Sequence, residues 1–274
     1  MPELPEVETI VRDLRPHLSG RRLEAVRSIN PLVLRHPEPE RFVAGVTGAE
    51  VRSVGRRGKF IRIGLESAEL LVVHLGMSGT LTLEEPDVEV RPHTHLRLEL
   101  AGGGELRFRD PRRFGRVLLG SEEELEAAGL LPRLGPEPLG AGFSSWVPPE
   151  AVQRSLRTLK AVLLDQSVVA GCGNIYADEA CFLARLRPTR RAAGLRPREW
   201  QRVVIALTVV MREAIRRRGT SFSDYRDGFG ARGEAYESLM VYGRTGLPCV
   251  RCGSRLRGTR VAGRMTVYCA RCQR

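Results

Sequence analysis

The sequence has very little lysine and few aromatic residues, although it is strongly basic. Of its 44 lysine and arginine residues only Lys59 and Lys160 are lysines, and the formal net charge is +12. A charge of this size favours a polyanionic partner, because cations that neutralise phosphates release bound counterions. Charge alone does not separate DNA, RNA and acidic membranes. The two lysines mark positions where arginine, with its different shape and hydration, is not an equivalent replacement.

Long hydrophobic runs and a signal segment are also missing. No apolar run approaches the roughly 18 residues of a membrane span, and no basic-then-apolar segment begins the chain. We therefore expect a cytoplasmic protein that makes no membrane contact. At 274 residues and 42% hydrophobic composition, the chain is long enough to form two domains with buried cores.

Cysteine is scarce outside one cluster near the end of the chain. Six cysteines in a reducing compartment favour metal ligation or buried thiols over disulfides. Four of them form two Cys-x-x-Cys pairs separated by sixteen residues: Cys249, Cys252, Cys269 and Cys272. This spacing is typical of one tetrahedral zinc ion held by four thiolates. We therefore expect one structural Zn²⁺, since a site with four protein ligands is closed to substrate.

Between the two cysteine pairs, two β-type runs joined through Gly263 predict a hairpin that projects Arg264 toward a phosphate.

The periodicity of the chain changes along its length. Apolar residues at helical spacing predict a helix over residues 5–14, and short alternating runs over 23–119 predict an antiparallel sheet. Proline and glycine then dominate a stretch that we interpret as a linker, and helical patterns follow it. The predicted divisions are 1–131, a linker at 132–149, a helical domain at 150–237 with a mobile Gly-rich loop at 219–237, and a zinc segment at 238–274.

The first residues combine prolines with carboxylates. Pro2 follows the initiator methionine, and a small second residue permits removal of Met1. The exposed α-amine would titrate near pH 8, so a useful fraction would be neutral and able to form an iminium with a carbonyl-like carbon. Glu3 and Glu6 lie close enough to relay protons for it. Proline and glutamate are also favoured in any first helical turn, so the motif alone is weak.

Taken together, the motifs resemble the formamidopyrimidine-DNA glycosylase family along the whole chain. The matching segments occur in the order of that family: PELPEVET, RRGKF, HLGMSG, DPRRFG, LLDQSVVAGCGNIYADEA, VYGR and the zinc segment. The resemblance implies an α+β multi-domain fold. It would have an N-terminal helix with an antiparallel β-sandwich, a helix-two-turns-helix domain, and a C-terminal zinc-finger β-hairpin.

The resemblance also implies a base excision repair activity. Pro2 would attack C1′ of an extruded nucleotide with an oxidised purine base, such as 8-oxoguanine or a formamidopyrimidine. Glu3 would donate and accept protons, and β and δ eliminations would cut the strand. The remaining residues implied to be catalytic are Glu6, Lys59 and Arg264. Extrusion is required, because the glycosidic carbon is inaccessible inside a duplex.

Residues for DNA binding follow from the same resemblance. A wedge of Met77, Arg112 and Phe114 would fill the gap left by the extruded base, as apolar intercalating side chains do. The implied backbone contacts are His74, Lys160, Asn174, Tyr242 and Arg264. We expect a monomer, at the nucleoid, that binds double-stranded DNA containing an oxidised base or an abasic site. The loop at 219–237 would close over the base.

Two other interpretations stay open. The endonuclease VIII branch prefers oxidised pyrimidines, but its members typically have glycine at the fourth position and lack the wedge phenylalanine, so Leu4 and Phe114 favour the purine branch. Ser78 stands where some members have glutamate, which leaves the base contacts undetermined. A non-catalytic zinc-finger nucleic-acid binder would explain the charge and the zinc, but it leaves the combination of Pro2 with the wedge motifs unexplained.

Overall fold

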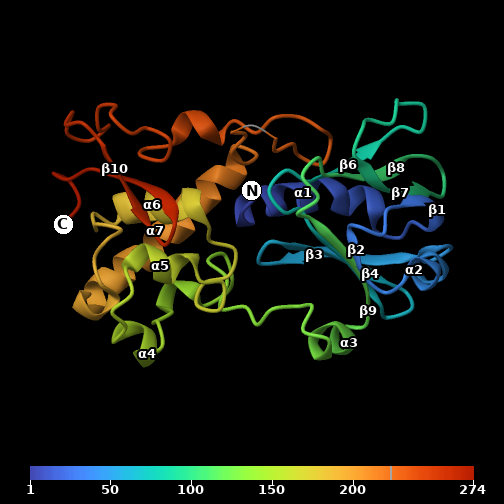
Figure 1. Cartoon of the computed structure of the whole chain (residues 1–274), viewed down its shortest axis with the longest axis horizontal. Helices are drawn as coiled ribbons and strands as arrows, with labels where there is room; N and C mark the ends of the chain where they lie inside the picture. Colours follow the sequence, from blue (N-terminus) through green and yellow to red (C-terminus); the bar gives the residue numbers. More distant parts are fainter. Residues whose placement is uncertain (223) are drawn as a thin grey trace. The chain divides into compact units, whose positions relative to one another are not determined.

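The computed structural model describes residues 1–222 and 224–274 and divides the chain into two compact units (Figure 1). The first unit contains Met1–Pro132 together with Arg217–Tyr236. The second contains Arg133–Arg216 together with Glu237–Arg274. The chain therefore passes between the units at three points, after residues 132, 216 and 236, whereas the predicted divisions ended at residues 131, 149 and 237.

The first unit begins with helix α1 (Leu4–Leu18). Its apolar residues recur at helical spacing, and Val7, Ile10, Val11 and Leu14 are completely buried. A proline in the first turn and Glu6 nearby favour the start of the helix, because the first N–H groups have no partner within it. This helix is longer than the predicted 5–14 and supplies one side of the core.

Two sheets form the β-sandwich of the first unit. The four-stranded sheet has the order β1-β7-β8-β6 and the five-stranded sheet has the order β2-β9-β5-β4-β3. The strands are β1 (Leu23–Ile29), β2 (Leu34–His36), β3 (Val51–Arg57), β4 (Phe60–Leu65), β5 (Leu70–His74), β6 (Thr80–Glu84), β7 (Thr94–Leu100), β8 (Glu105–Arg109) and β9 (Arg116–Gly120). All pairs are antiparallel except β2 with β9, which are far apart in sequence and so need no hairpin turn.

The core of this unit lies between the sheets and α1. Apolar residues from every strand and from α1 contribute to it, including Ile61, Val73, Leu98 and Phe108. Two short helices, α2 (Pro39–Val46) and α3 (Glu122–Ala127), complete the unit. The core also includes Tyr225, from the segment 217–236.

The second unit is mainly helical. Its helices are η1 (Phe143–Ser145), α4 (Glu150–Gln153), α5 (Leu159–Leu164), α6 (Asn174–Leu183), η2 (Ala192–Gly194) and α7 (Pro197–Arg216), and η3 (Ala235–Ser238) spans the boundary between the units. The helical pattern over residues 151–166, after the predicted linker, does not form one continuous helix. The helix breaks there, because the Thr158 side chain accepts the Ala161 N–H and caps a new helix, α5.

A β-hairpin completes the second unit, and the predicted α+β architecture is confirmed. Strands β10 (Arg257–Val261) and β11 (Arg264–Tyr268) are joined by Ala262 and Gly263. Both turn residues have positive φ, which a two-residue hairpin turn of this hand requires.

The predicted linker at 132–149 is packed rather than free. Phe143 is 3% exposed and its ring stacks on Trp146, with ring centroids 5.3 Å apart. The Pro138 carbonyl also accepts the Thr208 hydroxyl of α7. Most of this segment therefore belongs to the second unit. Across the described parts of the chain, no helix combines the length and apolar character that crossing a membrane requires.

Candidate active site and nucleic-acid interface

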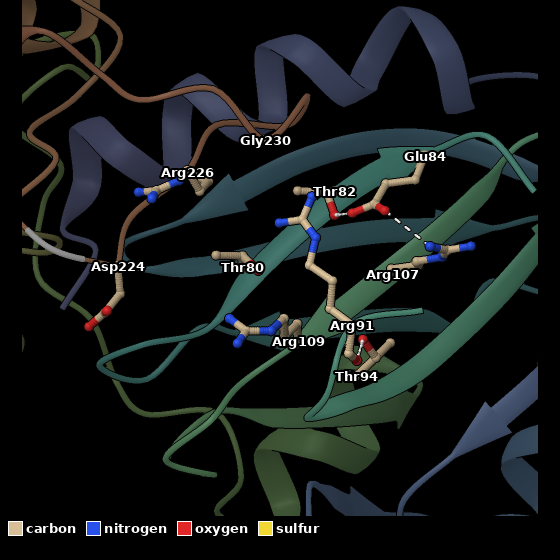
Figure 2. A pocket seen from close by; sticks show the side chains of 10 residues that line it. All are labelled: Thr80, Thr82, Glu84, Arg91, Thr94, Arg107, Arg109, Asp224, Arg226 and Gly230. Carbon is tan, nitrogen blue, oxygen red and sulfur yellow. Dashed lines mark hydrogen bonds and ion pairs between the residues drawn. The ribbon is translucent and has the colours of Figure 1, made fainter. Parts of the chain in front are cut away.

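A polar pocket of about 130 Å³ lies on the outer face of the four-stranded sheet (Figure 2). Thr80 and Thr82 of β6 point to this face, because Leu81 between them points into the core. Arg226 and Gly230 line it from the segment 217–236. Its lining combines threonine hydroxyls and arginines with two carboxylates, Glu84 and Asp224. None of the predicted catalytic residues lines this pocket, so the candidate active site lies elsewhere in the unit.

The predicted nucleophile and carboxylates meet at the start of α1. Pro2 is buried, and Glu3 is 2% exposed. Glu6 Oε2 accepts the backbone N–H of Glu3 at 2.8 Å, and its Oε1 accepts the backbone N–H of Thr220 at 2.8 Å. Glu6 therefore ties the first turn to the segment 217–236.

Whether the Pro2 nitrogen can act as a nucleophile depends on whether it is part of an amide or is a free amine. Met1 is 48% exposed, and its peptide bond makes the Pro2 nitrogen a tertiary amide, which is not a nucleophile. Removal of Met1 would leave a secondary amine at the same place, next to the buried Glu3 carboxyl. The exposed Met1 is open to such removal.

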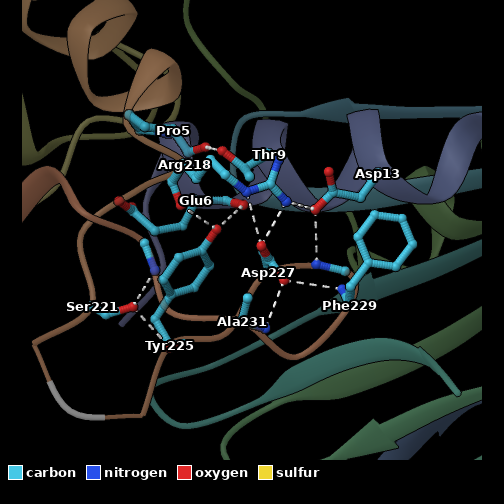
Figure 3. A network of polar contacts seen from close by, with 12 residues as sticks. Pro5, Glu6, Thr9, Asp13, Arg218, Ser221, Tyr225, Asp227, Phe229 and Ala231 are labelled. Atoms are coloured by element: carbon cyan, nitrogen blue, oxygen red, sulfur yellow. Dashed lines mark hydrogen bonds and ion pairs between the residues drawn. The ribbon is translucent and has the colours of Figure 1, made fainter.

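The segment 217–236 is held on α1 by a shared arginine (Figure 3). Arg218 Nη2 donates to Asp13 Oδ2 at 2.7 Å and to Asp227 Oδ2 at 2.6 Å. The two carboxylates raise the pKa of Arg218 above its ordinary value. Asp13 Oδ2 also accepts the Gly228 N–H at 3.0 Å. Because α1 supplies Asp13, the ion pairs connect the segment directly to the helix that begins with Pro2 and Glu3.

Further hydrogen bonds shape the same segment (Figure 3). Asp227 Oδ1 accepts the N–H groups of Phe229 at 3.0 Å and Ala231 at 2.9 Å. Tyr225 is 6% exposed, and its hydroxyl donates to the Arg218 carbonyl at 3.1 Å. The loop expected to be mobile at 219–237 is therefore anchored at several described residues.

Asp110 connects the two loops that carry the predicted wedge. This carboxylate is completely buried and accepts the Ser78 hydroxyl at 2.6 Å, the Gly115 N–H at 2.7 Å and the Arg112 N–H at 3.2 Å. The backbones also approach closely, since a Cβ on Gly76 would lie 2.5 Å from the Gly115 nitrogen. The HLGMSG and DPRRFG loops therefore form one assembly, in which Ser78 has a structural partner.

The apolar wedge residues are exposed on the surface of this assembly. Met77 is 37% exposed and Phe114 is 55% exposed. The Arg112 guanidinium carbon lies 4.8 Å from the centroid of the Phe114 ring, a cation–π contact that orients both side chains. Apolar side chains exposed on rigid loops are what an intercalating wedge requires.

Lys59 and His74 are neighbours on the five-stranded sheet. Lys59 lies with Gly58 in the turn between β3 and β4 and is 7% exposed. His74 ends β5 opposite Phe60, and their ring centroids are 4.8 Å apart. Burial, together with the positive charges of Arg116 and Lys59, lowers the pKa of His74 to about 4. His74 is therefore neutral at pH 7.

The tautomer of His74 follows from its hydrogen bond. The Gly76 N–H donates to Nδ1 at 3.2 Å, so the single proton of the neutral ring lies on Nε2. His74 therefore offers an uncharged N–H donor, which can bind a phosphate oxygen without adding charge.

In the second unit, Asn174 begins α6 with an unsatisfied side chain. Its Oδ1 is buried, and within the described ranges 1–222 and 224–274 no atom hydrogen-bonds to it. This amide oxygen is an acceptor that a donor from outside the described residues could satisfy.

Glu179 of α6 holds the segment that carries Tyr242. The carboxylate is 2% exposed and accepts the N–H groups of Met240 and Val241 at 2.9 Å and of Tyr242 at 2.8 Å. Burial raises its pKa, although these three hydrogen bonds oppose the shift. The backbone at the predicted Tyr242 contact is therefore fixed by a buried acid.

Lys160 is not at a surface. It is completely buried, and its Nζ lies 2.7 Å from Asp178 Oδ1, 2.8 Å from the Thr266 hydroxyl and 3.0 Å from the Met265 carbonyl. Burial raises the pKa of Asp178 to about 6, although the Lys160 ammonium lowers it. The prediction of a DNA contact by Lys160 is therefore corrected, because this side chain joins α5, α6 and β11.

The four predicted zinc ligands come together. The Sγ atoms of Cys249, Cys252, Cys269 and Cys272 all lie within 4.8 Å of one another. Tetrahedral Zn–S bonds of about 2.3 Å place thiolates about 3.8 Å apart, so the cluster fits one zinc ion. In the β10–β11 hairpin, Arg264 is the first residue of β11, and its side chain is exposed, as predicted.

Three positioning residues were not identified from the sequence: Asp110, Glu179 and Arg218. Asp110 and Glu179 lie inside the motifs DPRRFG and YADEA, so the motifs contained them. No local pattern indicates that an acid is buried beneath backbone N–H groups. One of the two carboxylate partners of Arg218 is Asp13, 205 residues away in sequence.

Family models match most of the chain. The formamidopyrimidine-DNA glycosylase N-terminal domain matches residues 1–117, the helix-two-turns-helix domain of the same glycosylases matches 134–226, and the zinc finger of these glycosylases and isoleucyl-tRNA synthetase matches 246–274. The formamidopyrimidine-DNA glycosylase of Geobacillus kaustophilus is 44% identical over 275 residues, covering 100% of each chain.

Solved structures agree with this similarity. The Fpg protein of Thermus thermophilus is 43% identical, with a TM-score of 0.85 and coverage of 99% of this chain and 98% of that one. A variant of the Lactococcus lactis Fpg protein, in complex with DNA containing Fapy-dG, is 31% identical with a TM-score of 0.88 and 99% coverage of both chains.

Proposed function

The chain belongs to the formamidopyrimidine-DNA glycosylase family, and from this premise we propose that it removes oxidised purines from DNA with the Pro2 amine as nucleophile. It is a base excision repair glycosylase with abasic-site lyase activity and one structural zinc. The observation that carries the proposal is the burial of Pro2 and Glu3 together at the start of α1, beneath an exposed Met1.

The chemistry begins once Met1 is removed. The Pro2 nitrogen forms a bond to C1′ as the bond from C1′ to the base breaks, and the base leaves with the electron pair. The Pro2 nitrogen then loses its proton, and the ring bond from C1′ to O4′ breaks as O4′ takes up a proton, which leaves an iminium between C1′ and the nitrogen. The iminium makes the C2′ proton acidic, so elimination can cleave the 3′ phosphate and then the 5′ phosphate. Glu3 donates and accepts the protons of these steps. Glu6 holds the first turn in place for it.

Residues of both units bind the DNA in this proposal. Met77, Arg112 and Phe114 fill the space left by the extruded base, and the cation–π contact holds the wedge rigid. The backbone is held by Lys59, His74, Asn174, Tyr242 and Arg264. Lys160 is excluded from this set by its burial.

The proposed substrate class is based on the similarity of the chain to its relatives. The Lactococcus lactis structure contains DNA with Fapy-dG, an oxidised purine lesion, and the matched relatives are formamidopyrimidine-DNA glycosylases. This supports the purine branch over the endonuclease VIII branch. The segment 217–236 lies beside the first turn of α1, where it can cover an extruded base. We also propose a cytoplasmic monomer at the nucleoid, because one lesion needs one active site.

Borohydride trapping tests the proposal. Borohydride delivers a hydride to the iminium carbon and converts the transient bond into a stable amine. With a duplex containing 8-oxoguanine opposite cytosine, we expect a covalent adduct that peptide mass mapping places at residue 2, without Met1. Pro2→Gly should lose base excision but retain lesion binding. Pro5→Gly, the same change in the same turn, is the control and should retain trapping.

Two results would contradict the mechanism. An adduct that maps to Lys59 would transfer the nucleophile to another residue. Tight lesion binding with no adduct would favour the non-catalytic binder.

A further inference from the structure

A second basic surface lies in the second unit, next to the zinc cluster. A groove of about 590 Å³ is lined by seven arginines and one glutamate, together with Leu186, Cys252 and Cys272. None of the residues assigned above to catalysis or DNA contact lines it. The groove is therefore a surface separate from the site already described.

Three segments build the groove and are hydrogen-bonded to one another. Arg185 follows α6, and its carbonyl accepts the Arg274 N–H at 3.2 Å. The neighbouring Leu186 carbonyl accepts the Gln273 side-chain amide at 2.8 Å. The third wall is the first part of α7, which carries Arg202. The positions of the arginine backbones are thus fixed by the fold.

The zinc cluster fixes two of the guanidinium groups in equivalent places. Arg251 precedes Cys252, and Arg271 precedes Cys272, so each occupies the same position in its Cys-x-x-Cys pair. The Arg251 guanidinium carbon lies 4.5 Å from the centroid of the Phe182 ring, which orients this side chain. A zinc ion bound by the four cysteines would hold both arginines on the groove.

The positive charge of the groove is only partly compensated. Glu199 is 3% exposed, and Arg190 binds it with bonds of 2.8 and 3.1 Å. Arg196 and Arg202 lie 3.4 and 3.7 Å from the same carboxylate. The other four lining arginines, Arg185, Arg251, Arg271 and Arg274, form no ion pair within the described residues. Seven positive charges minus one carboxylate and the two net negative charges of a zinc–tetrathiolate leave about four positive charges.

We propose that this groove binds the sugar–phosphate backbone of a second nucleic-acid segment while the active site holds the lesion duplex. Planar guanidinium groups match phosphate oxygens, and several of them along one groove match the regular charges of a phosphodiester chain. An acidic peptide fits less well, because Leu186 is the only aliphatic residue lining the groove in the described structure and it is 1% exposed. Such a surface would allow the enzyme to contact two stretches of DNA at once.

The experiment first saturates the active site. The protein is mixed with an excess of an unlabelled short duplex that contains a tetrahydrofuran abasic-site analogue, and this binding is measured separately. A fluorescently labelled undamaged duplex is then titrated, and anisotropy is recorded at several salt concentrations. We expect the labelled duplex to bind, and R271E/R274E to weaken this binding by roughly tenfold or more, with the salt slope reduced by about 2.

The matched control is R198E/R212E. Both arginines are exposed on α7 but do not line the groove, so the same change of charge should leave second-duplex binding within about twofold. Zinc content and the excision rate on the short lesion duplex should be unchanged in R271E/R274E.

Three results would overturn the proposal: no second-duplex binding by the natural sequence, equal losses in both variants, or preferential binding of polyglutamate, which would indicate an acidic protein partner. Failure of the abasic duplex to bind would count against the proposed repair function instead. In that case the labelled duplex is titrated alone, and the two variants are compared in the same way.

Discussion

At the scale of single residues, His74 shows how burial sets the chemistry of a contact. Its ring is held neutral by desolvation and by the nearby charges of Arg116 and Lys59. Because the native pKa is about 4 and that of an unfolded histidine is about 6.5, the unfolded chain binds the proton first as the pH falls. The contribution of His74 to stability is therefore complete above about pH 6.5 and is lost between about 6.5 and 4.

A nuclear magnetic resonance titration of the free protein checks this prediction. The His74 ring signals should remain those of a neutral imidazole at pH 6 and should shift near pH 4. His74→Gln should remove the corresponding dependence of unfolding free energy on pH. A ring that titrates near 6.5 would contradict the prediction.

The neutral ring also predicts how DNA binding depends on salt. His74→Ala should weaken lesion binding at pH 7.5 without changing the slope of log K against log salt, because no charge is removed. Arg264→Ala should weaken binding and reduce the slope by roughly 1, since an exposed cation releases about one counterion. Equal slope changes in the two variants would show that His74 is charged in the complex.

The sequence was informative about residues inside motifs and uninformative about their surroundings. The spacing of the cysteines was enough to predict the zinc cluster. A DNA contact was predicted for Lys160 because this residue lies in a segment that matches the family and is one of only two lysines in the sequence. Its partner Asp178 is 18 residues further on, and neither periodicity nor composition indicates that the pair is buried.

At the scale of elements, the buried ion pair of Lys160 and Asp178 joins α5 to α6, and hydrogen bonds from Lys160 reach β11. Lys160→Met would leave Asp178 buried and unpaired, which costs about 3–5 kcal/mol. In the double variant K160M/D178L the charge is absent, and the loss should be much smaller. Chemical denaturation of the two variants measures the difference.

Arg154→Met is the control for this comparison. The Arg154 side chain is 80% exposed, and its ion pair with Glu150 lies on the surface, so the change should be about 0–1 kcal/mol. If K160M were as mild as R154M, the pair would not support the packing of the hairpin.

Apolar periodicity was enough to predict that α1 and the sandwich strands exist, although α1 extends to Leu18, beyond the predicted residue 14. The placement of the segment 217–236 was not predictable, because polar contacts hold it in place. Its glycines and charges are typical of a mobile loop, whereas Arg218 and Tyr225 anchor it to α1 through Asp13 and the Glu6 carbonyl. Local sequence cannot show that a distant helix supplies Asp13.

At the scale of the whole molecule, the two units should respond differently to loss of zinc. Both tryptophans, Trp146 and Trp200, belong to the second unit. Removal of zinc by a chelator should therefore lower the midpoint of the transition seen by tryptophan fluorescence, because the four thiolates would no longer be bridged. The calorimetric transition of the first unit should stay in place.

Colorimetric zinc analysis should return one ion per chain before chelation. Re-addition of zinc is the control, and it should restore the fluorescence transition. A fluorescence midpoint that does not move on chelation would show that the cluster does not stabilise this unit.

The first crossing lies next to the predicted division at residue 131 and the third next to that at residue 237, whereas the second, after Arg216, has no predicted counterpart. Composition indicated a change near residue 131, and the first unit ends at Pro132. The return of the chain to the first unit over 217–236 was not predicted, since consecutive residues give no sign of the distant core that they enter.

This return has a consequence for synthesis on the ribosome. The first 132 residues emerge early, but the core that they form includes Tyr225, and the first turn of α1 is held by Thr220. The N-terminal unit therefore cannot complete its folding until most of the second unit has been translated. A nascent chain stalled before residue 217 would carry Pro2, the proposed nucleophile, but would lack the segment that holds the first turn of α1, so we expect it to be inactive on a lesion.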